Sequence, residues 1–264
     1  MADIESQQAL KQALKASQSW WDGVGVEIPT LPPAAPKTLK KTARTTPKRQ
    51  PTQSTPITPE KNSELTDRLA KAEAVASAAP TLEALKTALE EFDAGVLSDH
   101  AQRMVFARGN SEADIMAIGE APGRQEDETG LPFVGEAGKL LDKMFAAIKR
   151  DDSNLYITYV CNWRPPGNRN PSEEELVLCR PFIRRHIELV APKIVVIVGG
   201  VSLQALTGKT GIMKTRGQWQ DLEIAGKNIP AMPLYHPAFL LRRPELKKHA
   251  WQDLLAIQNR STEL

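Results

Sequence analysis

The chain has 264 residues, and its 34 basic and 32 acidic residues leave a formal net charge of +2. This length suits one sizeable domain with an appendage, and the near balance of charge gives no bulk electrostatic sign of a nucleic-acid partner. No apolar run approaches the roughly 18 residues of a membrane span, the first residues lack a signal-peptide pattern, and two cysteines are too few for a disulfide framework. These features predict a soluble, cytoplasmic protein without membrane contact.

Residues 1–63 are predicted to be an N-terminal tail. Within it, residues 4–21 form a short helix with Leu10, Leu14 and Trp21 on one side, next to Trp20. Such a helix either packs back on the domain or docks a protein partner.

A linker rich in proline, threonine and lysine follows, since eight of the chain's twenty prolines fall between residues 29 and 59. This composition buries too little apolar surface to offset its ordering entropy. Six basic residues without an acid lie between Lys37 and Arg49, so the segment is a solvated linker, a phosphate-binding arm, or both.

The folded domain is predicted over residues 64–264. Residues 64–92 are helical with an interruption at Pro80, and strands and helices alternate after them. The expected strands are 114–118, 155–160, 193–198 and 229–234, and the expected helices are 137–149, 172–190, 201–207 and 244–258. The pattern predicts a three-layer α/β/α domain around a mostly parallel, four-stranded sheet.

The stretch from Gly119 to Gly138 is a long loop between the first strand and a helix, at the sheet edge where α/β proteins bind ligands. Five glycines let its backbone approach a ligand closely. Phe133 is either a stacking platform or a plug under the loop. No Gly-Lys-Ser/Thr follows, so the stretch is not a Walker motif.

Three further loops at strand ends carry candidate residues. Residues 162–170 combine Arg164 and Arg169 with three asparagines, and a glycine pair at 199–200 marks a tight turn that is more often structural. Residues 235–244 place His236 where it can donate to a developing anion. The apolar run behind it, Leu240 and Leu241, either wedges into DNA beside arginines or caps the core.

Four strings in order and spacing carry a resemblance: GEAPGRQEDETGLPFVGEAGKLLDKM, RPPGNRNPSEEE, TRGQW and HPAFLLRRP. The chain resembles the bacterial and archaeal family 4 uracil-DNA glycosylases from about residue 81 to 258. The resemblance implies a DNA-repair enzyme that acts as a monomer, extrudes uracil from DNA and hydrolyses its N-glycosidic bond, leaving an abasic site.

The resemblance, together with the loop residues described above, predicts roles for thirteen residues. It assigns catalysis to Glu120, Glu126, Asn168 and His236, with Glu126 placing the water and His236 stabilising the oxygen of the leaving uracil. It assigns uracil binding to Gly119, Ala121, Phe133 and Tyr159. It assigns DNA contact to Leu240, Leu241 and Arg242. The loop arginines Arg164 and Arg169 are predicted from their own setting to contact DNA as well.

The sequence departs from the family at its [4Fe–4S] cluster. Family members carry four cysteines, whereas here the first two positions fall in Phe92–Gly95, the third is Trp163, and Cys179 alone matches. A cluster held by thiolates needs a nearly complete set. We therefore expect no metal and no cofactor, with Phe92 and Trp163 filling the space by apolar packing.

A second departure is Tyr159, where the family has an asparagine that reads the uracil edge. A phenol offers one hydroxyl in place of an amide's donor and acceptor. Two hypotheses follow: an active glycosylase without a cluster, or a non-catalytic or altered-specificity DNA-binding relative.

Overall fold

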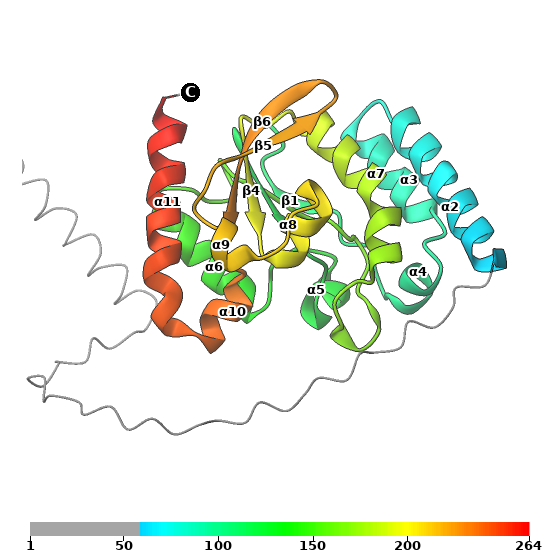
Figure 1. Ribbon diagram of the computed structural model, residues 1–264, viewed down its shortest axis with the longest axis horizontal. Helices are drawn as coiled ribbons and strands as arrows, with labels where there is room; N and C mark the ends of the chain where they lie inside the picture. Colours follow the sequence, from blue (N-terminus) through cyan, green and yellow to red (C-terminus); the bar gives the residue numbers. More distant parts are fainter. Residues whose placement is uncertain (1–58, 264) are drawn as a thin grey trace, which may run out of the picture. The chain divides into compact units, whose positions relative to one another are not determined.

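The computed structural model describes residues 59–263. The predicted helix over residues 4–21 and nearly all of the proline-rich linker lie outside the described residues. Contacts between Cα atoms divide the chain into Met1–Glu64 and Leu65–Leu264. The second unit is described here by itself (Figure 1).

A six-stranded sheet forms the centre of this unit, in the order β1-β3-β2-β4-β6-β5. The strands are β1 Ala107–Gly109, β2 Ile115–Gly119, β3 Tyr156–Tyr159, β4 Ile194–Val198, β5 Gln220–Ile224 and β6 Lys227–Leu234. The four inner strands pair in parallel, and β1 and β5 pair antiparallel at the two edges.

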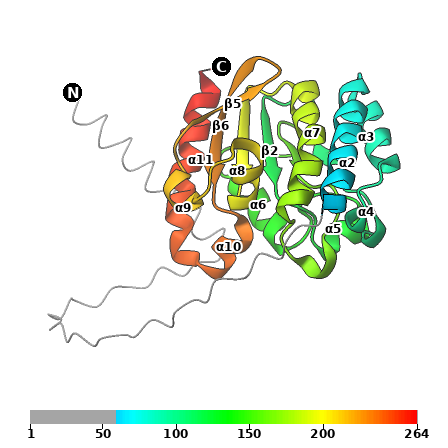
Figure 2. The ribbon, with the colours of Figure 1, turned by 45° about the vertical axis from the view of Figure 1, so that its right-hand side comes forward.

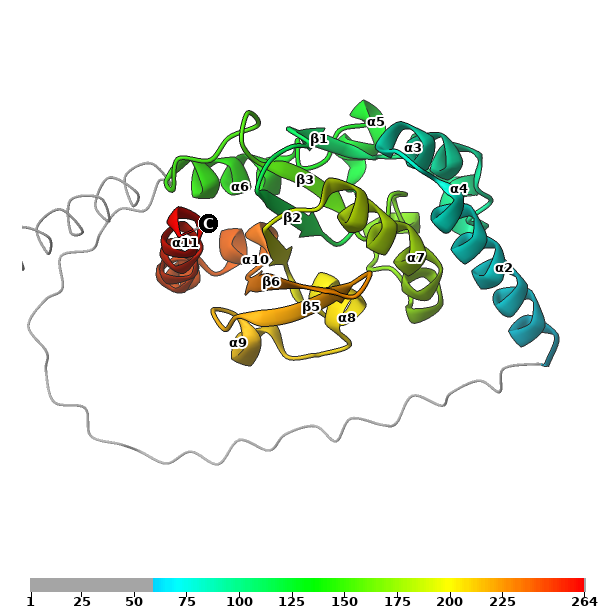
Figure 3. The ribbon, with the colours of Figure 1, turned by 90° about the horizontal axis from the view of Figure 1, so that it is seen from above.

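Helices cover both faces of the sheet. They are α2 Pro59–Ala78, α3 Leu82–Glu91, α4 Val96–His100, α5 Arg124–Thr129, α6 Glu136–Ala146, α7 Glu173–Val190, α8 Gly200–Thr207, α9 Ile212–Thr215, α10 Pro237–Arg242 and α11 Lys247–Thr262, with 3-10 turns η1 Pro166–Asn168 and η2 Pro244–Leu246. Figure 3 shows α6, α10 and α11 on one side of the sheet, and α3, α7 and α8 on the other. The fold class is therefore the predicted three-layer α/β/α arrangement.

The strongest sequence signals fold as expected. All five residues of β2 and of β4 are buried, as continuous apolar strands covered on both faces should be. The predicted capping box also forms at the start of α7, where Glu175 N–H donates to Ser172 Oγ and Ser172 N–H donates to the Glu175 carboxylate.

The structure corrects the predicted sheet and two predicted loops. The sheet has six strands rather than four, because short edge strands β1 and β5 were not recognised. The stretch 119–138 contains α5, and the segment after the last parallel strand contains α10. The last helix begins at Lys247, after η2, rather than at 244.

The region of Phe92 and Trp163 is part of the hydrophobic core. Both side chains are buried in one cluster with Cys179, and the Phe92 ring lies edge-on to Phe182 at 4.8 Å between centroids. Cys161 donates its S–H to the Trp163 carbonyl at 3.2 Å. Hydrogen bonding to Cys161 and burial raise the pKa of Cys179 well above its ordinary value. This thiol is therefore protonated and packs as a small apolar group.

The carboxyl ends of the parallel strands meet at one edge of the sheet. Figure 1 and Figure 2 show α5 and α10 in the lower part of the view, at the end of the molecule toward which these strands run. This edge carries the loops in which sequence analysis located the candidate site. Among the described residues, no helix combines the length and apolar character that a membrane crossing requires.

Candidate functional site

A pocket of about 430 Å³ opens at this edge, which is within the usual size range of small-molecule sites. Nine of the thirteen predicted site residues line it, namely Glu120, Ala121, Glu126, Phe133, Tyr159, Asn168, Arg169, His236 and Arg242. The other four, Gly119, Arg164, Leu240 and Leu241, do not line it.

Phe133 and Tyr159 form an aromatic wall of the pocket. Their ring centroids are 4.8 Å apart, and Phe133 N–H donates to the Tyr159 hydroxyl at 2.9 Å. Burial raises the pKa of Tyr159 well above its ordinary value, and the negative charge of Glu126 adds a smaller increase. The phenol therefore keeps its proton. Because its oxygen already accepts from Phe133, Tyr159 can offer the pocket a donor.

Two glycines make the position of Phe133 possible. A Cβ on Gly119 would lie 2.5 Å from the Phe133 ring, and a Cβ on Gly138 would lie 1.8 Å from the Phe133 carbonyl oxygen. Phe133 itself has a left-handed φ of +54°, which is uncommon for a bulky residue. The backbone therefore fixes Phe133 in the pocket wall, and its ring packs directly on Gly119 because that residue has no side chain.

His236 is the N-cap residue of α10 and faces the pocket. Its Nδ1 accepts the Ala238 N–H at 3.2 Å. Burial, together with the positive charge of Arg242, lowers the pKa of His236 to about 4. The imidazole is therefore neutral at pH 7, and because Nδ1 is an acceptor, its proton is on Nε2. His236 is thus a neutral hydrogen-bond donor.

The Glu120 carboxyl group lies in the pocket wall at the end of β2. Burial raises the pKa of Glu120 to about 7. Its carboxylate makes no hydrogen bond or ion pair with another described residue. A carboxylate in this state is available to a bound ligand, and a strongly shifted pKa in a pocket is typical of functional groups.

Glu126 differs from Glu120 in its environment. Its Oε2 accepts the Gly123 N–H, and its Oε1 accepts the Val134 and Gly135 N–H groups, each at 3.0 Å. These bonds connect the start of α5 to the end of the loop. Glu126 therefore holds the loop in shape while part of its side chain lines the pocket.

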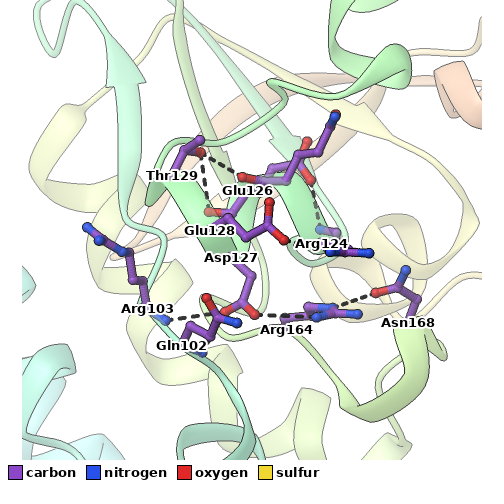
Figure 4. Close-up of polar contacts among 11 residues, drawn as sticks. Gln102, Arg103, Arg124, Glu126, Asp127, Glu128, Thr129, Arg164 and Asn168 are labelled. Carbon is purple, nitrogen blue, oxygen red and sulfur yellow. Dashed lines mark hydrogen bonds and ion pairs between the residues drawn. The ribbon is translucent and has the colours of Figure 1, made fainter.

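Asn168, which lines the pocket, is linked to Arg164, which lies behind it. Arg164 Nε donates to Asn168 Oδ1 at 2.6 Å, and Arg164 Nη1 lies 3.5 Å from the buried carboxylate of Asp127 (Figure 4). Asp127 is not among the site residues predicted from the sequence. The signal for this link was weak, because Asp127 and Arg164 are 37 positions apart.

The structure separates the residues predicted to contact DNA. Leu240 is fully buried on the inner side of α10, whereas Leu241 is 45% exposed. This corrects the prediction for Leu240, which packs in the core, whereas the Leu241 side chain is exposed and its predicted contact with DNA stays a prediction. Arg242 is exposed beside it.

Arg169, the remaining residue of this group, already has a protein partner. Its Nη1 and Nη2 each donate to one oxygen of the Glu175 carboxylate at 2.6 Å.

Phe239 and Asn170 also line the pocket although they were not among the predicted site residues. Phe239 lies three residues after His236 on α10, and its ring is 5.3 Å from that of Tyr235. The sequence signal that could have found it is the N-cap His followed by Pro237, which marks a helix start.

The sequence of the chain matches a known protein family and several of its members. The model of the Uracil DNA glycosylase superfamily matches residues 106–255. The chain is 39% identical over 154 residues to a type-4 uracil-DNA glycosylase of Archaeoglobus fulgidus, covering 56% of this chain and 77% of the relative. It is 41% identical over 162 residues to the type-4 enzyme of Sulfurisphaera tokodaii, covering 58% and 73%. It is 38% identical over 157 residues to that of Thermotoga maritima, covering 57% and 79%.

Proposed function

This chain belongs to the uracil-DNA glycosylase superfamily, and from that premise we propose that it is a type-4 uracil-DNA glycosylase of DNA repair. It extrudes uracil from DNA and hydrolyses the bond between the base and deoxyribose, leaving an abasic site. The observation that supports this most is one pocket that holds a neutral histidine donor, an aromatic wall and a carboxylate without a partner among the described residues.

The chemistry at the base requires a hydrogen-bond donor. When the N-glycosidic bond breaks, its electron pair leaves with uracil, and negative charge develops on the base oxygens. The Nε2–H of His236 can donate to such an oxygen without transferring a proton, and a preorganised donor in a partly dry site stabilises this charge strongly. The wall formed by Phe133 and Tyr159 provides an apolar surface for the base.

The chemistry at the sugar requires negative charge and a water molecule. Positive charge develops on the deoxyribose ring as uracil leaves, and water then adds to the sugar carbon. Because three backbone N–H groups occupy the Glu126 carboxylate, Glu120 is the carboxylate that is free to stabilise the cation or accept a proton from the water. In this proposal Glu126 places the loop and Glu120 acts on the reaction.

Glu120 should give the reaction a pH dependence. Its ionised form is the active one, so the single-turnover rate should rise about tenfold per pH unit below pH 7 and level off above it, because the pKa of Glu120 is about 7. Glu120→Gln should be slow at every pH, with a flat profile. Rates measured from pH 5 to 9 test this, with Glu136→Gln on the exposed face of α6 as control. An unchanged profile in Glu120→Gln would assign the ionisation to another group.

The same shift has a consequence for stability. The folded-state pKa of Glu120 is above its unfolded value, so the folded state binds the proton more tightly, and stability falls as pH rises from about 4.5 to 7. Glu120→Gln should therefore raise the free energy of unfolding at pH 8 by about 1–3 kcal/mol. Thermal unfolding at pH 4 and pH 8 measures the difference. Equal effects at the two pH values would show that ionisation is not the cause.

Tyr159 should relax the choice of base. Its hydroxyl can donate to the base but cannot also accept, so it reads one feature of the uracil edge. Tyr159→Asn supplies a donor and an acceptor, and we expect the excision rate for uracil over hypoxanthine to rise by about tenfold or more. Tyr159→Phe keeps the ring, removes the hydroxyl and should lower the same ratio. A ratio that falls in Tyr159→Asn would show that the phenol is itself the recognition group.

The proposed function is tested with labelled oligonucleotides that carry one uracil, in single-stranded DNA and in a duplex opposite guanine. We expect free uracil and an alkali-labile abasic site without added metal or nucleotide, and no product from a matched cytosine oligonucleotide. No lysine is among the described residues that line the pocket, so the enzyme should not cut the strand itself. Absence of uracil release by the purified protein in excess over DNA would contradict the proposal.

The non-catalytic alternative is not favoured. A protein that merely binds DNA has no need for a neutral donor and an unpaired carboxylate in one pocket, and the similar proteins are named as enzymes. The altered-specificity alternative rests on Tyr159 and is tested by the ratio described above.

The enzyme is proposed to work without an iron–sulfur cluster. The whole chain has two cysteines, whereas a [4Fe–4S] cluster takes four thiolates, so the residues present do not fit this group. Phe92 and Trp163 are buried where the family resemblance has cysteines, which supports apolar packing in place of a cluster.

Three further expectations concern the setting of the enzyme. Two buried free cysteines fit a reducing cytoplasm. We expect a monomer, which light scattering after size exclusion would measure. The helix predicted over residues 4–21 either packs on the domain or docks a protein partner, and it lies outside the described residues.

A further inference from the structure

Asp127, Arg164 and Asn168 form a line of side chains that ends at the pocket wall (Figure 4). Asp127 lies in α5, Arg164 follows β3, and Asn168 ends η1. The contacts are Arg164 Nη1 to Asp127 Oδ2 at 3.5 Å and Arg164 Nε to Asn168 Oδ1 at 2.6 Å. Asn168 alone of the three lines the pocket.

Asp127 is the fixed end of this line. Its side chain is 1% exposed, and its Oδ1 accepts the backbone N–H groups of Gln102 at 2.8 Å and Arg103 at 3.2 Å. These bonds leave Oδ2 for Arg164. A buried carboxylate that is held by backbone donors and faces a guanidinium keeps that guanidinium in one place.

Arg164 is committed to contacts inside the protein. Its side chain is 21% exposed, compared with 75% for Arg124 on α5, which pairs with Glu128 on the surface. An arginine whose Nε and Nη1 already serve protein partners is poorly placed to hold a DNA phosphate. These contacts argue against the prediction that Arg164 contacts DNA, and they indicate a role for Arg164 inside the protein.

Asn168 depends on Arg164 for its orientation. It is exposed and has a left-handed φ of +56°, and it follows Gly167, which has a φ of +65° and open space around it. Packing therefore does not fix the amide. With Oδ1 bound to Arg164, the Nδ2 hydrogens are the part of the amide that remains for a ligand.

We propose that Arg164 is a positioning residue: held by Asp127, it turns the Asn168 amide so that Asn168 donates, and does not accept, a hydrogen bond in the pocket. The partner of Asn168 is then an acceptor oxygen of the extruded nucleotide or of the attacking water. This inference rests on the proposed uracil excision, and it assigns Asp127 and Arg164 a role that acts through Asn168.

The test measures single-turnover excision of uracil and the salt dependence of DNA affinity in the full chain. Arg164→Gln should lower the rate constant by about 10- to 100-fold, as expected when a reacting group is misplaced. Asn168→Ala should be equally slow, and the double variant should be no slower than either single one, because both remove the same interaction.

Two further variants test the geometry of the line. Arg164→Lys keeps the charge but not the planar guanidinium, and should also be slow. Asp127→Asn should fall between these variants and the parent.

DNA affinity separates positioning from phosphate contact. Arg164→Gln should leave the slope of log Kd against log salt unchanged, whereas Arg242→Gln should lower it by about one. Arg124→Gln is the matched control and should keep the parent's rate, and release by the parent and this control tests the proposed function separately. Parent-like excision by Arg164→Gln together with a reduced salt slope would overturn the inference. Losses that multiply in the double variant would also overturn it.

Discussion

Replacement of His236 by Ala is expected to slow uracil excision by about 10²–10³-fold, the usual effect of losing one donor to a developing anion. The pKa of His236 is lowered to about 4 by burial and by Arg242, so the imidazole is neutral throughout the working pH range. Its Nδ1 accepts from the Ala238 backbone, which places the proton on Nε2. The measurement is the single-turnover rate constant at saturating enzyme.

Two controls separate the donor from the helix cap. Asn is a good N-cap residue, so His236→Asn should keep the start of α10 intact while its shorter side chain fails to present a donor at the same point. It should therefore be nearly as slow as His236→Ala. His100→Ala changes an exposed histidine of α4 and should have no effect. Excision by His236→Ala at the parent rate would remove His236 from the mechanism.

The parts of the fold that were predictable have local signals. The apolar run of β4 and the Ser172–Glu175 capping box are complete within a few residues, and both elements formed where expected. By contrast, β5 alternates buried and exposed residues over five positions, and β1 has three residues. β1 is too short to show a period, and its pairing with β3 defines it. β5 is as long as β4, and its alternation was a usable strand signal that the prediction missed.

Two helices of the site were missed for different reasons. The α5 sequence RQEDET has no apolar face, and the Glu126 carboxylate connects its start to a later part of the loop. This is a tertiary bond that no local pattern contains. For α10 a local signal existed, since His236 at the N-cap is followed by Pro237 at the first helical position.

The candidate site was predictable as a set of residues but not as an arrangement. Family motifs identify Glu120 and Glu126 alike. The structure distinguishes them, because Glu126 accepts three backbone N–H groups and Glu120 accepts none from residues 59–263. The buried Leu240 and the Asp127–Arg164 contact also depend on packing between distant segments. Chemistry at a site follows from which partners each group already has, and sequence does not contain that information.

Replacement of Trp163 by Ala should lower the free energy of unfolding by roughly 3–5 kcal/mol, because it removes a large buried side chain and leaves a cavity. Trp163 is 4% exposed and belongs to the core cluster with Phe92, Cys179 and Phe182. Trp163→Phe keeps an aromatic ring and should cost much less. Trp251 of α11 is partly exposed, and Trp251→Ala should have a smaller effect. Urea unfolding followed by circular dichroism measures the differences.

The same experiment tests the proposal that apolar packing takes the place of a cluster. If core packing rather than a metal holds this region, a chelator should not move the urea midpoint of the parent, and the purified protein should be colourless and free of iron and acid-labile sulfide. Trp163→Ala should then be destabilised equally with and without chelator. Stoichiometric iron in the parent, or a midpoint that falls with chelator, would contradict the proposal. A parent that resists chelator while Trp163→Ala keeps its full stability would show that the indole contributes nothing to the core.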